Sequence, residues 1–218
     1  LSGTLENLTL KNIHIKGGNA QRWAYAKGDL VFENVTFEAT SVYAIHFDGI
    51  TAGTNLTYKN CTIIGWAAMG GTPASCVFDG CTIKDNGTYG VIRTYFPATI
   101  KDCTFDVANA NTEDIYEDGI HAVGGAKVVV DNCTNANGDM KNLVNVAGTS
   151  IVVLDGVEIK NAALVGDNGY ATFEEALVAV KAGETLTLLD NLTMSEILVL
   201  DKAITLNGNG KKLTSTAA

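Results

Sequence analysis

One eight-residue pattern returns seven times along this chain and constrains its fold more than any other feature. The first copies read LTLKNIHI at 8–15 and LVFENVTF at 30–37, and the last reads VVLDGVEI at 152–159. A supersecondary unit repeated at a period of this size is typical of a solenoid. The spacing between copies drifts between 20 and 30 residues, which favours a parallel β-helix over the stricter leucine-rich and hexapeptide solenoids.

The fifth position of each copy predicts a sharp bend. It is held by Asn12, Asn34, Asn60, Gly80, Asp102, Asn132 and Gly156. These residue types tolerate the left-handed backbone region, so we predict positive φ at the five Asn and Asp positions. Apolar residues lie four and two places before the bend and one and three places after it, which puts them on one side of the chain. We therefore predict an all-β fold, a right-handed single-stranded parallel β-helix with seven coils over residues 1–162.

Four cysteines fall one place after the bend, where other copies have Ile13, Val35 or Val157. They are Cys61, Cys81, Cys103 and Cys133. Because they exchange with aliphatic residues and form no C-x-x-C pair, we expect a buried ladder of free thiols and no metal site. Cys76 occupies another apolar position of the repeat. The threonines two places after the bend are interpreted as exposed β-branched strand residues and not as an ice-binding face.

The chain changes character at residue 163. Residues 172–182 predict one short capping helix, with Thr172 and Glu175 forming a capping box. We expect its apolar stripe of Phe173, Ala176, Leu177 and Val180 to cover the coil core at the carboxy-terminal end of the stack. Further strands complete the region 163–218, which we interpret as the start of a next module. Open coil ends also make head-to-tail self-association a plausible mode of assembly.

The composition of the chain limits the classes of partner that it is expected to bind. The 218 residues carry a formal charge of −9 and only 15 Lys and Arg, so we expect neither nucleic acid nor an anionic membrane as a partner. No apolar run approaches the roughly 20 residues of a membrane-spanning helix, so membrane insertion is not expected. Leu1 leads straight into a repeat coil, and we expect a mature fragment of a longer, secreted or cell-surface protein.

The run YATFEEALVAVKAGETLTLLDNLTM, followed by ITLNGNGKKLT, resembles the opening segment of pectate-lyase-like β-helix modules in large bacterial surface proteins. In such modules this segment precedes the repeats, whereas here it follows them, which suggests a tandem array. The resemblance implies a non-catalytic extracellular module that acts as a rigid stalk or adhesin surface. Carbohydrate or a host surface protein is the partner it implies.

Proteins of this fold also include polysaccharide lyases and glycoside hydrolases, so a carbohydrate-active enzyme fragment is the alternative. Arg93, Asp118 and His121 are the weak catalytic candidates. The run Glu117-Asp118-Gly119-Ile120-His121 looks like the start of the polygalacturonase pattern, but a second aspartate pair and an Arg-x-Lys are missing. Scattered histidines are more often surface or core residues than catalysts, and we do not expect catalysis.

Ligand binding is expected on the third strand of each coil and on the acidic loop at 111–118. The candidate residues are Tyr43, His46, Arg93, Tyr95, Tyr116, Glu117, Asp118 and His121. Tyrosine rings offer stacking faces for sugars, although structural packing explains them equally well. The four carboxylates of the acidic loop make calcium conceivable, but their spacing matches no known calcium loop. We therefore predict no cofactor and no metal.

Overall fold

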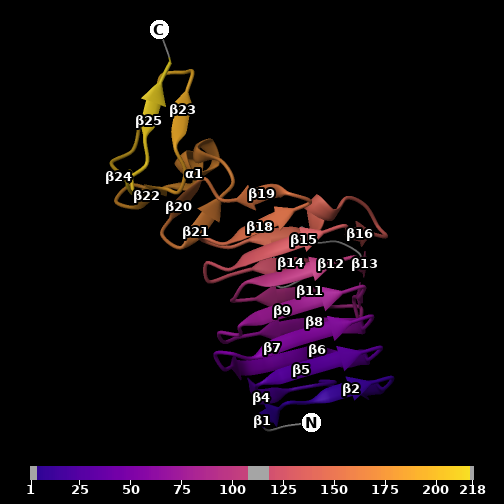
Figure 1. The fold of residues 1–218 in the computed structure, drawn as a ribbon. Helices are drawn as coiled ribbons and strands as arrows, with labels where there is room; N and C mark the ends of the chain where they lie inside the picture. Colours follow the sequence, from indigo (N-terminus) through magenta and orange to yellow (C-terminus); the bar gives the residue numbers. More distant parts are fainter. Residues whose placement is uncertain (1–3, 108–117, 217–218) are drawn as a thin grey trace.

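The computed structural model describes residues 4–107 and 118–216, and it is a parallel β-solenoid of about 9 turns (Figure 1). The coils stack from the amino-terminal end upward, and the last part of the chain leans away from the top of the stack. The all-β parallel solenoid predicted from the repeats is therefore confirmed. No helix in the described residues is long and apolar enough to cross a membrane.

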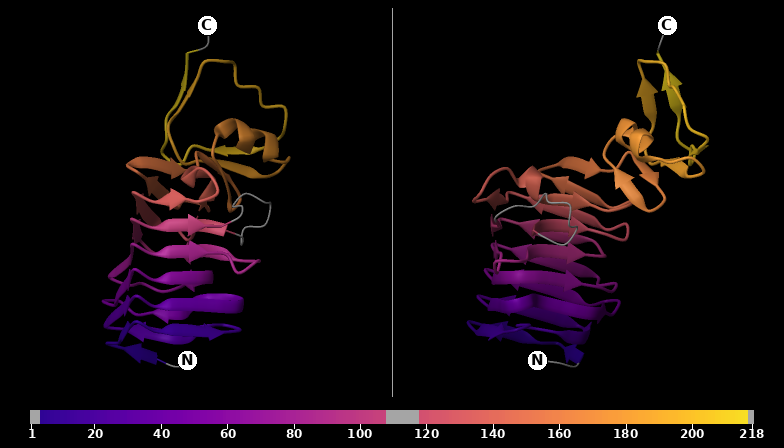
Figure 2. Two further views of the ribbon diagram at one scale, coloured as in Figure 1. Left: turned by 90° about the vertical axis from the view of Figure 1, so that its right-hand side faces the viewer. Right: turned by 180° about the vertical axis from the view of Figure 1, so that it is seen from behind.

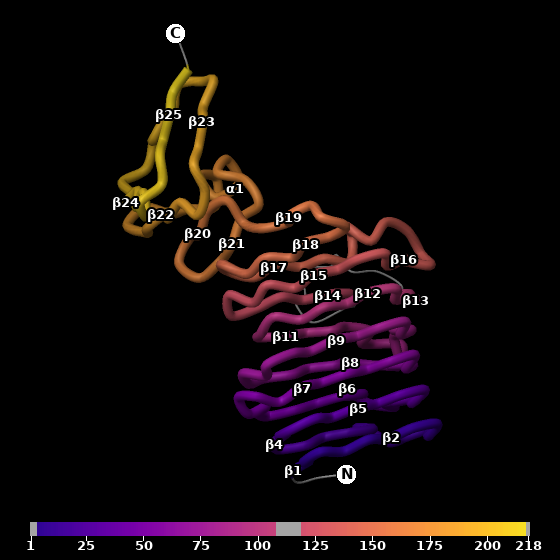
Figure 3. The backbone as a smooth tube through the Cα atoms, viewed as in Figure 1, coloured from indigo at the N-terminus to yellow at the C-terminus, as the bar shows by residue number. Residues whose placement is uncertain are grey.

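The strand before each bend belongs to an eight-stranded sheet. Its members are β2 (Thr9–Lys11), β5 (Asp29–Glu33), β7 (Asn55–Lys59), β9 (Ser75–Asp79), β12 (Ala98–Lys101), β15 (Lys127–Asp131), β18 (Ile151–Leu154) and β19 (Val157–Lys160). Neighbours pair in parallel and in register from β2 to β18, so equivalent repeat positions stack directly. Figure 3 lets the reader follow these coils as one continuous tube.

The strands after each bend and the third strands share an eleven-stranded sheet. It contains β1 (Thr4–Glu6), β3 (His14–Gly17), β4 (Trp23–Lys27), β6 (Thr36–Ile50), β8 (Thr62–Met69), β10 (Thr82–Lys84), β11 (Gly90–Thr94), β13 (Thr104–Asp106), β14 (Asp118–Ala122), β16 (Thr134–Asn135) and β17 (Val144–Val146). A 3-10 helix, η1 (Met140–Leu143), leads into β17. In β6 and in β8 the strand after the bend and the third strand are joined into one long strand. Register shifts between Glu38 and Ile45 mark the corner between the two parts of β6.

The predicted bends are confirmed. Asn12, Asn34, Asn60, Asp102 and Asn132 have φ values between 50° and 55°. The bend side chains also bond between coils: Asn34 Nδ2 donates to Asn12 Oδ1 at 3.0 Å, and Asn132 Nδ2 donates to Asp102 Oδ1 at 2.6 Å. At these two pairs of bends, the residues that permit the left-handed turns therefore also link neighbouring coils.

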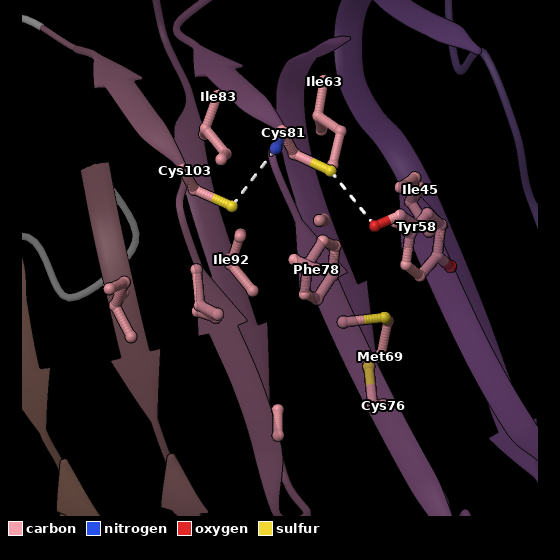
Figure 4. Close-up of a cluster of buried hydrophobic side chains, with 14 of the residues drawn as sticks. Ile45, Tyr58, Ile63, Met69, Cys76, Phe78, Cys81, Ile83, Ile92 and Cys103 are labelled. Carbon is pink, nitrogen blue, oxygen red and sulfur yellow. Dashed lines mark hydrogen bonds between the residues drawn. The ribbon is translucent and has the colours of Figure 1, made fainter. Parts of the chain in front are cut away.

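A continuous apolar core fills the stack. Its aromatic column runs Phe32–Tyr58–Phe78, with ring centroids 4.9 and 4.6 Å apart and nearly parallel planes. All five cysteines are free and buried, as predicted. Figure 4 shows two hydrogen bonds between thiols and the backbone of neighbouring coils. Cys81 Sγ donates to Tyr58 O at 3.3 Å, and Cys81 N donates to Cys103 Sγ at 3.3 Å. The ladder is therefore a packing device with its sulfur atoms satisfied between coils.

The seventh copy of the repeat does not form the parallel bend that its sequence predicted. Asp155 and Gly156 both have positive φ, 47° and 82°, and β19 runs antiparallel to β18. Two successive left-handed residues make a tight hairpin turn, which an Asp-Gly pair favours strongly. Val157, expected in line with the cysteines, is consequently 67% exposed. The stack thus ends in a hairpin and not in a further parallel bend.

The region after the hairpin has its own small core. It consists of β20 (Ala163–Val165), β21 (Asn168–Tyr170), α1 (Phe173–Ala179), β22 (Thr185–Leu188), β23 (Leu192–Met194), β24 (Thr205–Asn207) and β25 (Leu213–Ser215), and we call it the C-terminal unit. Parallel pairing of β22 with β24 and of β23 with β25 resumes the solenoid pattern. Figure 2 shows this unit beyond the end of the coils in both views.

The one α-helix of the described residues is shorter than expected. Its capping box is present as predicted, since Glu175 N donates to Thr172 Oγ1 and Thr172 N donates to Glu175 Oε2. Its apolar stripe, however, packs with Ala163, Val165, Leu186 and Leu188 in a cluster separate from the coil core. The expectation that the helix covers the coil core is therefore wrong. The antiparallel strands β20 and β21 give the helix a sheet of its own.

Candidate ligand-binding surface on the third strands

The third strands bring several of the predicted site residues into one row. Arg93 lies beside His121 of the next strand and beside Ala68 of the preceding one, and Ala68 lies beside His46. Side chains at paired positions of neighbouring parallel strands point to the same face. His46, Ala68, Arg93 and His121 therefore form a row along the outer side of the stack.

An aromatic ladder lies next to this row. The ring centroids of Tyr43 and Trp66 are 5.2 Å apart, and those of Trp66 and Tyr89 are 5.4 Å apart. Tyr43 also lies 4.3 Å from the ring of His46. Because the Trp66 ring lies between two others and is only 8% exposed, its faces serve packing. Trp66 was not among the residues proposed from sequence; its place in the ladder depends on the register shift in β6.

Arg93 is held between two rings. Its guanidinium carbon lies 6.0 Å from the centroid of Trp66 and 5.1 Å from that of Tyr95, which are cation–π distances. Tyr95 itself is 47% exposed. Arg93 therefore joins the buried aromatic ladder to an exposed tyrosine.

His121 is almost completely buried, with 3% of its surface exposed. Burial, with a smaller contribution from the neighbouring charge of Arg93, lowers the pKa of the imidazole to about 4. Its Nδ1 atom has no hydrogen-bond partner among the residues that the structure describes. At neutral pH the ring is uncharged, and no acceptor at Nδ1 orients it as in a catalytic pair.

His46 differs from His121 in having an acidic neighbour. Its Nε2 lies 2.8 Å from Asp48 Oδ1, and the Asp48 side chain is 51% exposed. The Nδ1 atom of His46 is buried and finds no hydrogen-bond partner within residues 4–107 and 118–216. This pair places one carboxylate at the solvent edge of the third strands.

The structure says little about the three remaining candidate residues, Tyr116, Glu117 and Asp118. Tyr116 and Glu117, with the rest of the acidic loop up to 117, lie outside the described residues. For Asp118 the structure gives the backbone, which pairs with Gly90 at the start of β14. Within residues 4–107 and 118–216, no group of three or more His, Cys, Asp or Glu side chains is placed to hold a metal ion.

Sequence reasoning missed Tyr25. This residue is 57% exposed, more than the 47% of Tyr95. It lies in the middle of β4, beside Gly49 of β6. A Cβ at Gly49 would lie 3.2 Å from the Tyr25 ring, so the ring rests on that glycine. A tyrosine followed one coil later by a glycine is the signal that would have found it, but only once the coil register is known.

Comparisons with known proteins add no relative: no family model, curated protein or solved structure matches this chain. The function of the chain is therefore inferred from its fold and from the geometry of its third-strand surface.

Proposed function

We propose that this chain is a non-catalytic, extracellular β-helix module of a repetitive, bacterial, pectate-lyase-like surface protein, acting as a rigid stalk or adhesin surface that binds carbohydrate. The observation that carries the proposal is the state of the third-strand face. Arg93 is held between Trp66 and Tyr95, and His121 is 3% exposed, whereas Tyr25 and Tyr95 reach solvent. Packed polar groups beside exposed rings favour binding over chemistry.

Rigidity is supported by the coil stack. One apolar cluster runs from Trp23 to Val152 without a break between coils. Ion pairs also join neighbouring coils along the outer face, with Lys11 Nζ 2.6 Å from Glu33 and Lys101 Nζ 3.0 Å from Asp79. Because each coil contacts its neighbours over its whole cross-section, bending the stack would disrupt core and ladder together.

The alternative, a fragment of a carbohydrate-active enzyme, gains no specific support from the geometry. Arg93 and His121 are adjacent, as a lyase base and its neighbour would be, but one is stacked and the other buried. A host surface protein as partner and head-to-tail association of copies remain part of the proposal, as does the absence of nucleic acid from its partners.

Retention and turnover on a polysaccharide panel, with and without calcium, test the proposal together. Immobilised neutral and acidic polysaccharides should retain the purified protein, and chelation of calcium should not release it. No new reducing ends or unsaturated products should form. Turnover that is abolished by Arg93→Ala or His121→Ala would establish the enzyme instead, and failure of retention on every polysaccharide would remove the carbohydrate-binding role.

A further inference from the structure

Each coil turns from its third strand into the eight-stranded sheet at one corner, and this corner carries few side chains. Glycines occupy it in four coils, at Gly49, Gly70, Gly71, Gly124, Gly125 and Gly148, while the coil of β11 has Tyr95, Phe96 and Pro97 there. These glycines follow the paired positions Phe47, Met69, Ala122 and Val146 in the register of the strands. We call this surface the glycine corner. Positive φ at Gly71, Gly124, Gly125 and Gly148 explains part of it as tight turns.

Two exposed tyrosines lie on the glycine corner. Tyr25, 57% exposed, rests on Gly49 of the next coil, and Tyr95, 47% exposed, rests on Gly124 of the next coil. A Cβ would lie 3.2 Å from the Tyr25 ring at Gly49 and 3.4 Å from the Tyr95 ring at Gly124. Because the strands β4, β6, β8 and β11 follow one another, the two tyrosines lie three coils apart, or about 14 Å along the axis.

A hollow continues the corner beyond Tyr95. It has a volume of about 310 Å³, and its walls include Gly124, Gly125, Gly148, Thr149, Leu164 and Asp167. Gly124 belongs both to this hollow and to the seat of the Tyr95 ring. Gly124 therefore joins the Tyr95 ring to the hollow, and Tyr25 lies three coils before Tyr95 on the same corner.

The charged groups beside the glycine corner and the hollow are mainly acidic or paired. Asp48 precedes Gly49, on which the Tyr25 ring rests, and its Oδ1 is paired with His46 Nε2, whereas Asp167 lines the hollow. The nearby lysines are engaged, since Lys27 Nζ lies 3.0 Å from Glu6 and Lys127 Nζ lies 3.8 Å from Glu158. Arg93 is behind Tyr95, stacked on its ring. Free carboxylate oxygens accept hydrogen bonds from hydroxyl groups and repel an anionic chain.

We propose that the glycine corner binds an uncharged glycan chain that runs along the solenoid axis, with sugar rings stacked on Tyr25 and Tyr95. The inference rests on the proposed carbohydrate-binding function and adds its site and its ligand class. Stacking uses the apolar faces of the sugar rings, while Asp48 and Asp167 accept hydrogen bonds from sugar hydroxyls. Glycine at the corner keeps the path between the two rings open.

Calorimetric titration of the whole chain with hexasaccharides tests this site. The probes are cellohexaose, xylohexaose, mannohexaose and chitohexaose, with a galacturonate hexasaccharide as the charged comparison. At least one neutral hexasaccharide should bind, and Tyr25→Ala and Tyr95→Ala should each weaken it about tenfold. Thr149→Arg, which fills the hollow from an exposed position, should weaken binding without altering the core. Ile197→Ala, which truncates an exposed side chain in the C-terminal unit, is the matched control and should bind as the wild type does.

The outcomes distinguish failure of the glycine-corner site from failure of the carbohydrate-binding function. Neutral hexasaccharide binding that survives both tyrosine substitutions would overturn the glycine corner and leave the carbohydrate-binding function standing. Binding of the galacturonate probe alone would overturn the uncharged ligand class. If no hexasaccharide binds, the site and the carbohydrate-binding function fail together. Thermal melts of each variant show whether it is folded, and a lowered melting temperature with unchanged affinity would mean that the rings only shield their glycines.

Discussion

The coil stack and the C-terminal unit are built from similar short strands, yet they bury their apolar residues to very different extents. At one repeat position Val35 and Cys61 are 0% and 1% exposed in the middle of the stack, whereas Ile13 in the first bend-containing coil is 44% exposed. In the C-terminal unit Val178, Ile197 and Val199 are 80%, 77% and 68% exposed. A coil cannot bury its own apolar face, so burial comes from the coils on either side.

The largest effect is expected in the middle of the stack, at Phe78→Ala. The Phe78 ring is 0% exposed and stacks 4.6 Å from Tyr58. Removing such a ring leaves a cavity that close-packed neighbouring coils cannot fill, and we expect a loss of about 3–5 kcal/mol in the free energy of unfolding. Both tryptophans, Trp23 and Trp66, lie in the stack, so urea unfolding followed by tryptophan fluorescence measures it.

Val77→Ala is the control for Phe78→Ala, because Val77 is the adjacent, half-buried residue on the outer side of β9. Its cost should stay near 1 kcal/mol or below. Equal losses for the two substitutions would mean that the continuous core does not dominate the stability of the stack.

Phe173→Ala should produce a smaller and local effect in the C-terminal unit. Phe173 is 3% exposed and belongs to the unit's separate core. We expect about 3 kcal/mol of local destabilisation, which a small core cannot offset. Amide hydrogen exchange should accelerate across residues 163–216, while the tryptophan midpoint stays unchanged. A tryptophan midpoint that falls equally would show that the two regions unfold as one unit.

The two regions should also respond to acid in different pH ranges. The folded stack holds the pKa of His121 at about 4, while an unfolded histidine titrates near 6.5. Between these values the unfolded chain binds a proton that the folded chain excludes, so stability falls as the pH drops from about 6.5 to about 4. We expect a loss of about 2 kcal/mol after allowance for solvent screening, and His121→Gln should remove it.

Acid should weaken the C-terminal unit only at lower pH. Lys160, 2.8 Å from Asp190, lowers the pKa of that carboxyl through a direct hydrogen bond. The stability that this pair contributes is therefore present above about pH 4 and is lost as the pH falls further. Hydrogen exchange measured at pH 7, 5 and 3 separates the two ranges. Loss of protection in the C-terminal unit between pH 7 and 5 would contradict this order.

The coil stack was predictable from sequence because the coils repeat the same residue types at the same positions. Asn or Asp at the bend and alternating apolar positions specify each coil, and the stacking of Asn12 with Asn34 follows from them. The seventh copy misled because Asp155-Gly156 satisfies the repeat and also the rule for a tight hairpin. The helix was found from its capping box, but the sheet on which it packs depends on the long-range pairing of β20 with β22.

The candidate surface was predictable only in part. The row of His46, Arg93 and His121 follows from counting coils, as the strand register shows. The burial of His121 and the contact of the Tyr43 ring with Trp66 do not follow, because both depend on side-chain packing that the repeat pattern does not specify. Tyr25 was missed for a related reason: a ring is exposed or covered according to its neighbour in the next coil, which lies more than twenty positions away in the sequence.

The smallest expected effect compares a bend inside the stack with the hairpin that ends it. Gly80 and Gly156 occupy the same repeat position, with φ values of 63° and 82°. Alanine costs about 1–2 kcal/mol in this backbone region at either site. At Gly80 the added Cβ would also lie 2.6 Å from Asn60 Oδ1, whereas at Gly156 it would meet nothing within 4 Å. Gly80→Ala should therefore lower the tryptophan-detected midpoint in urea more than Gly156→Ala does, because only the stacked bend has a neighbour that must move. Equal midpoints would mean that the contact between bend side chains of successive coils adds nothing to the backbone preference.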